Sequence, residues 1–592
     1  MSNFVAPEIK KFVAWDYVVF IALFLVSASI GVLFAIKERK KKSSKEFLVG
    51  GRQMTCGPIA FSLTSSFTSA VAILGTPSEV YRYGASFIFF TLAHTLAIIF
   101  TAELFVPVFY RSGITSTYEV SKKDIITLFS YYPFANHLVF FGFTVTGFDL
   151  WGSVAATGIV CTFYCTLGGL KAVVWTDVFQ MVIMLTGLIT VLIRGTILNG
   201  SPTNIWQRAS EGSRLNVFDF DMDPLRRHTF WTIVVGGAFT WLGVYGVNQS
   251  TIQRCISCKS EKHAKLALYL NLLGLWIVLV CSVFSGLAMY SHYKDCDPWT
   301  GAFISAPDQL MPYFVMDIFS SMPGVPGLFV ACAFSGTLST VAASINALAT
   351  VTFEDFIKEL FPDMSEKRST WLRENTTDLY PHIPGSYKII TNYHLLLPNS
   401  PLQSCILVIT NSFSFIFAQG AIGGLLIGIT IAFWVAIGSF IYPVPSVKAV
   451  PLDLSTAGCI LTYLVGNYCH KLLCPLLPCF RRPLLADTWY SLSYLYFSAI
   501  GCLGCIAAGL LISFATGWFN PKFWFCPRTQ LSCGPSNTHL ATNLQVSLNL
   551  ESNLQTTRHT MLRDNVESVS PHTACIRFDS GRMVPPGEQL RL

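Results

Sequence analysis

Charged residues are scarce in this chain. Asp, Glu, Lys and Arg together make up 12% of its 592 residues, whereas hydrophobic residues make up 52%. A soluble protein of this length has too little interior for so much apolar surface, because a single hydrophobic core stops growing at roughly 250 to 300 residues. The composition therefore excludes a soluble protein and predicts an all-α, polytopic protein of the lipid bilayer.

Catalytic motifs are also missing. The sequence contains no G-x-S-x-G, no H-E-x-x-H and no phosphate-binding glycine loop, so we predict that the protein is not an enzyme and uses no cofactor. The net charge of +7 comes largely from short loops between apolar runs, so it does not indicate a nucleic-acid partner. The 18 cysteines are scattered, many of them within apolar runs, and they predict no disulfide framework.

Long apolar runs recur along the chain and predict about 11 to 13 membrane spans. The strong candidates are 14–36, 57–76, 84–108, 150–168, 172–193, 229–250, 266–290, 326–350, 420–442 and 489–516, and the weaker ones are 124–147, 402–418 and 456–474. The basic block 37–45 after the first run predicts that the N-terminus faces outward. Alternation of the spans then places Arg254 and the lysines after it inside, and the acidic stretches 217–223 and 295–297 outside.

Hydroxyl side chains crowd two of these runs. Residues 62–70 read SLTSSFTSA, and an uninterrupted membrane helix gains little from so many hydroxyls. Residues 335–346 read SGTLSTVAASIN, and on a helix Gly336, Ser339 and Thr340 share one face. Neutral oxygens in this pattern suit a small hard cation. Close packing of small residues against a neighbouring helix explains the same face equally well from these residues alone.

A second interruption lies in the run 229–250, where residues 243–249 read GVYGVNQ. Two helices that unwind in corresponding places, here and at 62–70, predict two inverted halves with a solute bound between them. Glycines that allow close helix packing are the alternative explanation.

Few ionisable residues lie within the apolar runs. Asp177 and Gln180 fall on one face of a helix, and a carboxylate inside a membrane indicates a functional site, here a stop for a cation on its way through. A structural pair between Asp177 and a lysine such as Lys171 is the alternative. His94 lies in another apolar run, where a histidine is more often a packed polar group than a ligand.

Four segments carry a resemblance to a known family. They are FLVGGR at 47–52, LGGLKAVVWTD at 167–177, and the stretches 246–254 and 336–346. With these segments the chain resembles the sodium:solute symporter family, and within it the sodium-coupled monocarboxylate transporters of the low-affinity, electroneutral type. The resemblance implies a LeuT-like inverted repeat of five plus five helices with additional flanking helices.

The resemblance also implies the ligands, with sodium as the coupling ion. The implied sodium site consists of backbone oxygens of Ser65, Thr68 and Gly336 and the hydroxyls of Ser339 and Thr340. Asp177 and Gln180 match positions that the family uses for a second sodium or for its release route.

The predicted solute is a small monocarboxylate such as lactate, pyruvate or nicotinate. Sugar-transporting relatives place polar side chains where this chain has Ala72, Thr91 and Trp241, and a sugar left without those partners binds poorly. A short carboxylate needs one anion-binding end and an apolar wall for its tail. The predicted substrate-binding residues are Phe67, Ala72, Thr91, His94, Trp241 and Tyr245, of which Phe67, Trp241 and Tyr245 form the wall.

The chain is predicted to contain five regions. They are an N-terminal span with a basic cytoplasmic loop (1–56), a transporter core (57–350), a cytoplasmic loop with a replaced segment (351–419), C-terminal spans (420–517) and a polar tail (518–592). The resemblance breaks off at 120–146, 372–419 and 453–485, so the core is incomplete relative to the family. The predicted function is sodium-coupled symport across a plasma membrane, at the apical face of an epithelium. A protein that inserts without transporting and an uncoupled facilitator are the alternatives.

Overall fold

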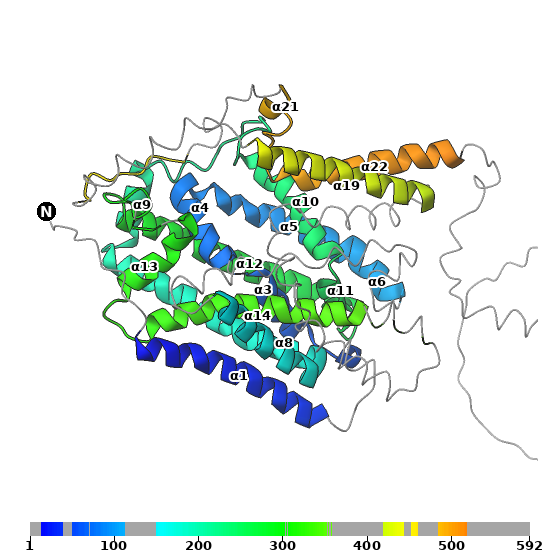
Figure 1. Cartoon of the computed structure of the whole chain (residues 1–592), viewed down its shortest axis with the longest axis horizontal. Coiled ribbons are helices and arrows are strands. Elements are labelled where there is room, and N and C mark those ends of the chain that lie inside the picture. Colours follow the sequence, from blue (N-terminus) through cyan, green and yellow to red (C-terminus); the bar gives the residue numbers. More distant parts are fainter. Residues whose placement is uncertain are drawn as a thin grey trace, which may run out of the picture. The chain divides into compact units, whose positions relative to one another are not determined.

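The structure is a computed structural model. It describes residues 13–38, 50–112 except 70, 150–361 except 302, 305, 352, 354–356 and 358–360, and then 418–442, 451–459 and 484–517. The chain divides into two compact units, Met1–Phe519 and Asn520–Leu592, and all described residues belong to the first. Within these ranges the regular structure is helical, as the composition predicts (Figure 1).

The described helices occur in the following order along the chain. Their bounds are α1 (Ala14–Glu38), η1 (Gly50–Arg52), α3 (Cys56–Phe67), η2 (Val71–Gly75), α4 (Thr76–Tyr83), η3 (Ala85–Phe89), α5 (Phe90–Phe100), η4 (Thr101–Phe105), α6 (Val106–Ser112), α8 (Leu150–Leu198), α9 (Pro202–Glu211), η7 (Thr232–Gly236), α10 (Gly237–Gly246), α11 (Gln249–Ile256), α12 (Glu261–His292), η8 (Pro307–Gln309), α13 (Leu310–Ile318), α14 (Val325–Val351), α19 (Ala418–Ile441), α21 (Leu484–Asp487) and α22 (Tyr496–Gly517).

Seven helices in the described ranges are long and apolar enough to cross a membrane, and an eighth span results if the bent pair Cys56–Phe67 and Ala72–Tyr83 counts as one. The chain is therefore a multi-pass membrane protein. The weaker predicted spans 124–147, 402–418 and 456–474 lie wholly or largely outside the described residues.

The boundary between two predicted spans lies at Gly169, as the sequence predicts. The sequence predicts separate spans at 150–168 and 172–193, and the element α8 contains both as two helices joined across a kink. The two helices run in opposite directions along α14, because Tyr164 and Cys165 bond the Leu338 and Ala342 carbonyls, whereas the later Met184 meets Cys332. Gly169 interrupts this element with φ 57° and ψ −158°, a conformation that residues with a Cβ avoid. Gly169 therefore lets the chain reverse between the two spans without a longer loop.

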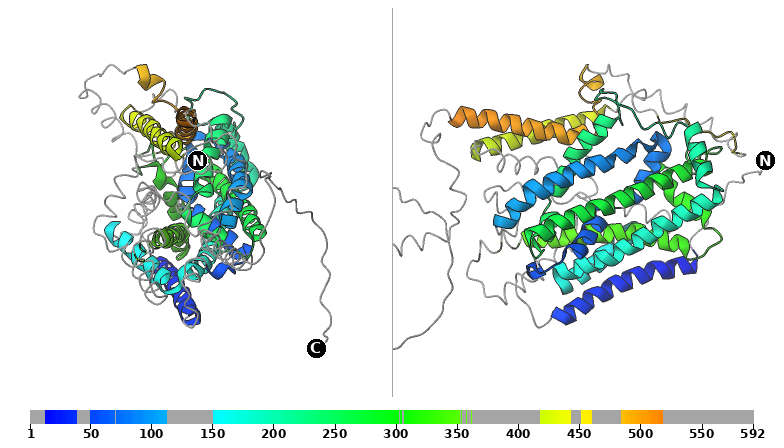
Figure 2. Two further views of the ribbon diagram at one scale, coloured as in Figure 1. Left: turned by 90° about the vertical axis from the view of Figure 1, so that its right-hand side faces the viewer. Right: turned by 180° about the vertical axis from the view of Figure 1, so that it is seen from behind.

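Two helices, α1 and α8, pack against α14 and hold it in place. α14 packs against both α8 and α1, and the three helices lie side by side in the opposite views of Figures 1 and 2. Phe20 of α1 and Phe334 of α14 form an edge-to-face ring pair with centroids 4.9 Å apart. The hydroxyl of Tyr164 on α8 donates to the carbonyl of Leu338 at 3.2 Å. These contacts fix the part of α14 that carries the next residues, Ser339 and Thr340.

α3 lies between α12, α8 and α14. Its Thr64 hydroxyl meets the Asn271 side-chain oxygen of α12 at 3.0 Å, and both groups are buried. α12 begins at Glu261, where the Ser260 hydroxyl accepts the His263 backbone N–H at 3.4 Å and caps the helix. Its 32 residues form a long, apolar helix against which the shorter α3 packs.

A disulfide joins Cys296, in the loop after α12, to Cys459. Beside it the Asp297 backbone N–H donates to the Ser455 carbonyl at 2.9 Å. The expectation of no disulfide is wrong here, because the two cysteines lie 163 positions apart and no spacing pattern indicates their contact. Disulfides persist in oxidising compartments, so this one favours the outward placement predicted for 295–297.

Removing this disulfide is expected to destabilise the protein. Cys459→Ser should reduce stability by about 2 kcal/mol or more, because the cross-link restricts the unfolded chain. Thermal unfolding of purified protein measures the effect, with Cys281→Ser as control because Cys281 is a free, partly buried thiol. A linked peptide containing Cys296 and Cys459 should occur in a non-reduced digest. Reaction of both thiols with a maleimide before reduction would contradict the assignment.

Candidate functional site

The hydroxyl-rich run breaks as predicted. α3 ends at Phe67, the Thr68 backbone N–H still bonds the Thr64 carbonyl, and the following helical segment Ala72–Tyr83 is bent by 62° from α3. The carbonyls in the last turn of a helix have no partner further along the same helix. The break therefore frees backbone oxygens of the last turn, which includes Ser65 and Ser66, in the interior of the protein. Ser65, Ser66 and Thr68 are all buried.

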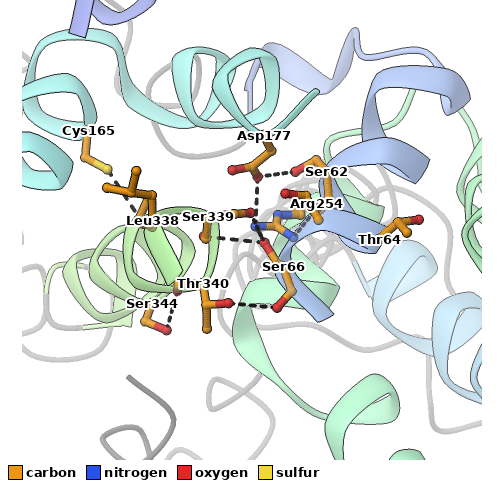
Figure 3. Close-up of polar contacts among 12 residues, drawn as sticks. Ser62, Thr64, Ser66, Cys165, Asp177, Arg254, Leu338, Ser339, Thr340 and Ser344 are labelled. Atoms are coloured by element: carbon orange, nitrogen blue, oxygen red, sulfur yellow. Dashed lines mark hydrogen bonds and ion pairs between the residues drawn. The ribbon is translucent and has the colours of Figure 1, made fainter. Parts of the chain in front are cut away.

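The face of α14 with Gly336, Ser339 and Thr340 meets the end of α3 directly (Figure 3). The Thr340 hydroxyl lies 2.8 Å from the Ser66 carbonyl and 2.8 Å from the Gly336 carbonyl. The Ser339 hydroxyl lies 2.7 Å from the Ser66 hydroxyl. Hydroxyl and carbonyl oxygens from two elements 273 positions apart thus converge at one point.

Ser66 is the residue of α3 that makes these contacts, although it is not among the implied sodium ligands. The hydroxyl of its neighbour Ser65, whose backbone oxygen the family resemblance implies as a sodium ligand, lies 3.7 Å from the sulfur of Met184. The Thr68 hydroxyl is buried and has no hydrogen-bond partner among the described residues. The hydroxyl pattern of 62–70 indicates the segment, but it does not identify which serine faces α14.

A buried ion pair adjoins this cluster. Asp177 of α8 and Arg254 of α11 are 0% and 1% exposed, and Arg254 Nη2 lies 3.2 Å from Asp177 Oδ2. The Ser62 hydroxyl donates to the same carboxylate oxygen at 2.6 Å. Arg254 also donates to the Ser62 carbonyl at 3.0 Å and to the Ser66 hydroxyl at 2.7 Å. The pair therefore connects directly to Ser66 and through it to α14 (Figure 3).

This pair corrects one expectation. Asp177 is paired with Arg254, not with Lys171 as the structural alternative expects. Arg254, which lies between two predicted spans in the sequence, belongs to the helix α11 and is almost wholly buried. α11 begins after the second predicted interruption, where α10 ends at Gly246 and the Asn248 side chain accepts the Ser250 N–H at 2.9 Å. That break turns the chain so that Arg254 points inward.

Gln180 lies one helical turn beyond Asp177, as predicted, and is fully buried. Its side-chain nitrogen and oxygen, and the second carboxylate oxygen of Asp177, have no hydrogen-bond partner within the described ranges. Buried polar atoms are rarely left in this state, so these groups are available to a ligand. The two acceptor oxygens suit a cation.

Aromatic side chains form a row that begins at the break in α3. The ring of Phe67 lies 4.3 Å from that of Tyr245, Tyr245 lies 6.0 Å from Trp241, and Trp241 lies 4.5 Å from His94, centroid to centroid. The Tyr245 hydroxyl accepts a hydrogen bond from the Asn271 amide at 3.1 Å. We call Phe67, Tyr245, Trp241 and His94 the aromatic row. It brings together four of the six residues predicted to bind the solute.

The other two predicted solute residues have local roles. Ala72 follows the break, and its backbone N–H donates to the Ser69 carbonyl at 2.9 Å. The Thr91 hydroxyl donates to the Ile88 carbonyl at 2.8 Å on its own helical segment.

Comparison with known proteins identifies the family. The model of the sodium:solute symporter family matches residues 47–128 and 139–377. Sodium-coupled monocarboxylate transporter 2 of Mus musculus is 59% identical over 537 residues, which are 86% of this chain and 85% of the mouse protein. The Homo sapiens protein of the same name is 60% identical over 535 residues, again 86% and 85% of the two chains. The chain belongs to the sodium:solute symporter family.

A solved structure with the same fold supports this architecture. It is that of a Na⁺-coupled sialic acid symporter, with a TM-score of 0.66 at 16% identity, and the match covers 85% of this chain and 98% of the other. This similarity confirms the LeuT-like fold that the sequence motifs predict. Membership of the sodium:solute symporter family also confirms the resemblance that segments such as 47–52 and 167–177 carry.

Proposed function

We propose that this sodium:solute symporter takes up short monocarboxylates, such as lactate, pyruvate and nicotinate, together with sodium. The proposal includes a place in the plasma membrane, at the apical face of an epithelium. The names of the Mus musculus and Homo sapiens relatives support the substrate class. The observation that carries the mechanism is the direct contact between Ser66 at the break in α3 and the Ser339 and Thr340 hydroxyls of α14.

Sodium is assigned to this junction. Backbone oxygens of Ser65, Thr68 and Gly336 and the hydroxyls of Ser339 and Thr340 would hold it as five neutral oxygens. The Thr340 hydroxyl donates to the Ser66 and Gly336 carbonyls, so a sodium ion at this junction would compete with these hydrogen bonds for the same oxygens. Because the oxygens come from both α3 and α14, sodium binding favours the arrangement in which the two helices meet.

Charge balance supports one sodium for each carboxylate. Asp177 already has its compensating charge in Arg254, so the site needs no second cation to neutralise it. One sodium and one monocarboxylate then cross with no net charge. Asp177 Oδ1 and Gln180, which are buried and without described partners, are assigned to the release route of the same ion.

The aromatic row is assigned to the solute. Phe67, Tyr245 and Trp241 offer an apolar wall beside the sodium junction, since Phe67 is the last residue of α3. A sugar would find few polar partners here, because Ala72 has no polar side chain and the Thr91 hydroxyl bonds its own helix. A short acid needs only a single polar contact in addition to this wall.

Lactate uptake into proteoliposomes tests the proposal. A tenfold inward sodium gradient should accumulate lactate up to about tenfold, since an electroneutral one-to-one cycle transfers the whole gradient. An imposed potential of 100 mV, inside negative, should leave the accumulation unchanged. Each net positive charge moved would add about 2.3 kcal/mol, a factor of roughly 50.

The alternatives give different results in the same experiment. Equal lactate entry with and without the sodium gradient would indicate an uncoupled facilitator. A folded, inserted protein that takes up no lactate under either condition would indicate the non-transporting form. A strong increase with the imposed potential would contradict the one-to-one stoichiometry.

A further inference from the structure

His94 is a buried histidine without a described partner. It lies on α5, within the apolar span Ala85–Arg111, and is 6% exposed. Neither of its ring nitrogens has a hydrogen-bond partner among the residues that the structure describes. Its neighbours are aromatic, with the Trp241 ring 4.5 Å and the Phe90 ring 6.2 Å away.

The nearby hydroxyls on the same helix are already engaged. Thr91 donates to the Ile88 carbonyl at 2.8 Å, and Thr95 donates to the Thr91 carbonyl at 2.6 Å. A buried N–H without a partner is unfavourable, and proteins rarely retain one without a function. An apolar side chain at position 94 would be more stable in this surrounding. The imidazole therefore requires a partner that arrives from outside the described chain.

We propose that His94 binds the carboxylate of the transported acid, an inference that rests on the proposed function. A neutral imidazole carries one N–H donor, and a hydrogen bond to an ionised carboxylate is among the stronger ones available to it. A neutral histidine also adds no charge, so it keeps the balance of one sodium and one monocarboxylate. The acid's apolar tail then lies along Trp241 and Tyr245, the next two members of the aromatic row.

The Tyr245 hydroxyl of the aromatic row is held by a contact within the protein. The Tyr245 hydroxyl accepts from Asn271, which in turn contacts Thr64 through its side-chain oxygen. This chain of contacts ties Tyr245 to α3 and to α12. Both ring nitrogens of His94 are buried without a partner among the described residues, so His94 gains most from a bound carboxylate and determines where that carboxylate lies.

Two substitutions at this position test the proposal. His94→Leu removes the N–H donor, and His94→Gln retains one. We expect His94→Leu to raise the lactate concentration for half-maximal sodium-dependent uptake at least about tenfold, and His94→Gln to change it by less than about threefold. Thr95→Val is the matched control, because it removes a hydroxyl from the same helix that bonds only to the Thr91 carbonyl. It should leave the half-maximal concentration unchanged.

Thermal unfolding of purified protein separates solute binding from packing. L-lactate should raise the unfolding midpoint of the unaltered protein and of His94→Gln, but not that of His94→Leu. Without lactate, His94→Leu should unfold at a higher temperature than the unaltered protein, because leucine leaves no buried polar atom unpaired. If His94 had only a structural role, His94→Leu would unfold at a lower temperature than the unaltered protein.

The outcomes distinguish this proposal from the proposed function. If His94→Leu takes up lactate with an unchanged half-maximal concentration, or unfolds at a lower temperature without lactate, the role of His94 is refuted and the symporter stands. If the unaltered protein takes up no lactate but is stabilised by it, and His94→Leu is not stabilised, the carboxylate site stands and transport is refuted. If lactate neither enters nor stabilises the unaltered protein, both are refuted.

Discussion

Arg254→Met is expected to destabilise the protein by about 3 to 5 kcal/mol and to abolish uptake, because it leaves the Asp177 carboxylate charged and buried without its partner. Both side chains are at most 1% exposed, so water cannot replace the guanidinium. The substitution also removes the donors to the Ser62 carbonyl and the Ser66 hydroxyl. The unfolding midpoint and the yield of monodisperse protein measure the effect.

The double substitution Asp177→Asn with Arg254→Met is the decisive companion. It removes both charges, and replacing a buried ion pair by neutral groups is often close to neutral for stability. We therefore expect the double variant to unfold near the unaltered protein and well above Arg254→Met alone. A double variant no more stable than the single one would show that the two side chains do not act as a charge pair.

An exposed arginine provides the matched control for Arg254. Arg226 forms ion pairs with Asp219 and Asp221, but its side chain is 45% exposed. Exposed pairs contribute about 0 to 1 kcal/mol, so Arg226→Met should change the unfolding midpoint little. If Arg226→Met lowered the unfolding midpoint as much as Arg254→Met does, burial of Arg254 would not explain the effect of its substitution.

Thr340→Val and Ser339→Ala are expected to raise the sodium concentration for half-maximal lactate uptake at least about tenfold. Each removes one neutral oxygen from the junction of α3 and α14, and a dehydrated ion does not recover that contact from the apolar surroundings. Valine preserves the branched shape of threonine, so the change is chemical and not a loss of packing. Lactate uptake measured over a range of sodium concentrations gives the result.

Two other hydroxyls of α14 serve as controls. The hydroxyls of Ser335 and Thr337 are buried and bond back to the Ala331 and Ala333 carbonyls of their own helix, at 2.8 and 3.4 Å. Ser335→Ala and Thr337→Val should therefore leave the sodium dependence unchanged. If they change it as much as Thr340→Val does, the effect belongs to the helix and not to the site.

The sequence predicts the breaks because their chemistry is local. Hydroxyls at nearly every position of 62–70 and the glycines of 243–249 disfavour a continuous apolar helix, and both runs unwind there in the structure. Helix geometry likewise predicts that Gly336, Ser339 and Thr340 share one face of α14. That this side faces α3 follows only from the family resemblance, since the two segments lie far apart in the sequence.

Other features depend on tertiary contacts that no local pattern carries. Arg254 stands near several lysines in the sequence, so charge counting places it between two spans on the inside, whereas the break before α11 turns it toward Asp177. Ser66 differs from its serine neighbour only in the direction it faces. The disulfide between Cys296 and Cys459 depends on where two distant loops meet.

Equilibrium binding of radioactive sodium to the purified protein, with lactate present, tests the sodium junction most directly. We predict one bound ion per chain at saturation for the unaltered protein and for Ser335→Ala, and a sodium affinity at least about tenfold lower for Thr340→Val. Binding of sodium by Thr340→Val with the affinity of the unaltered protein would contradict the assignment of the ion to the contact between α3 and α14.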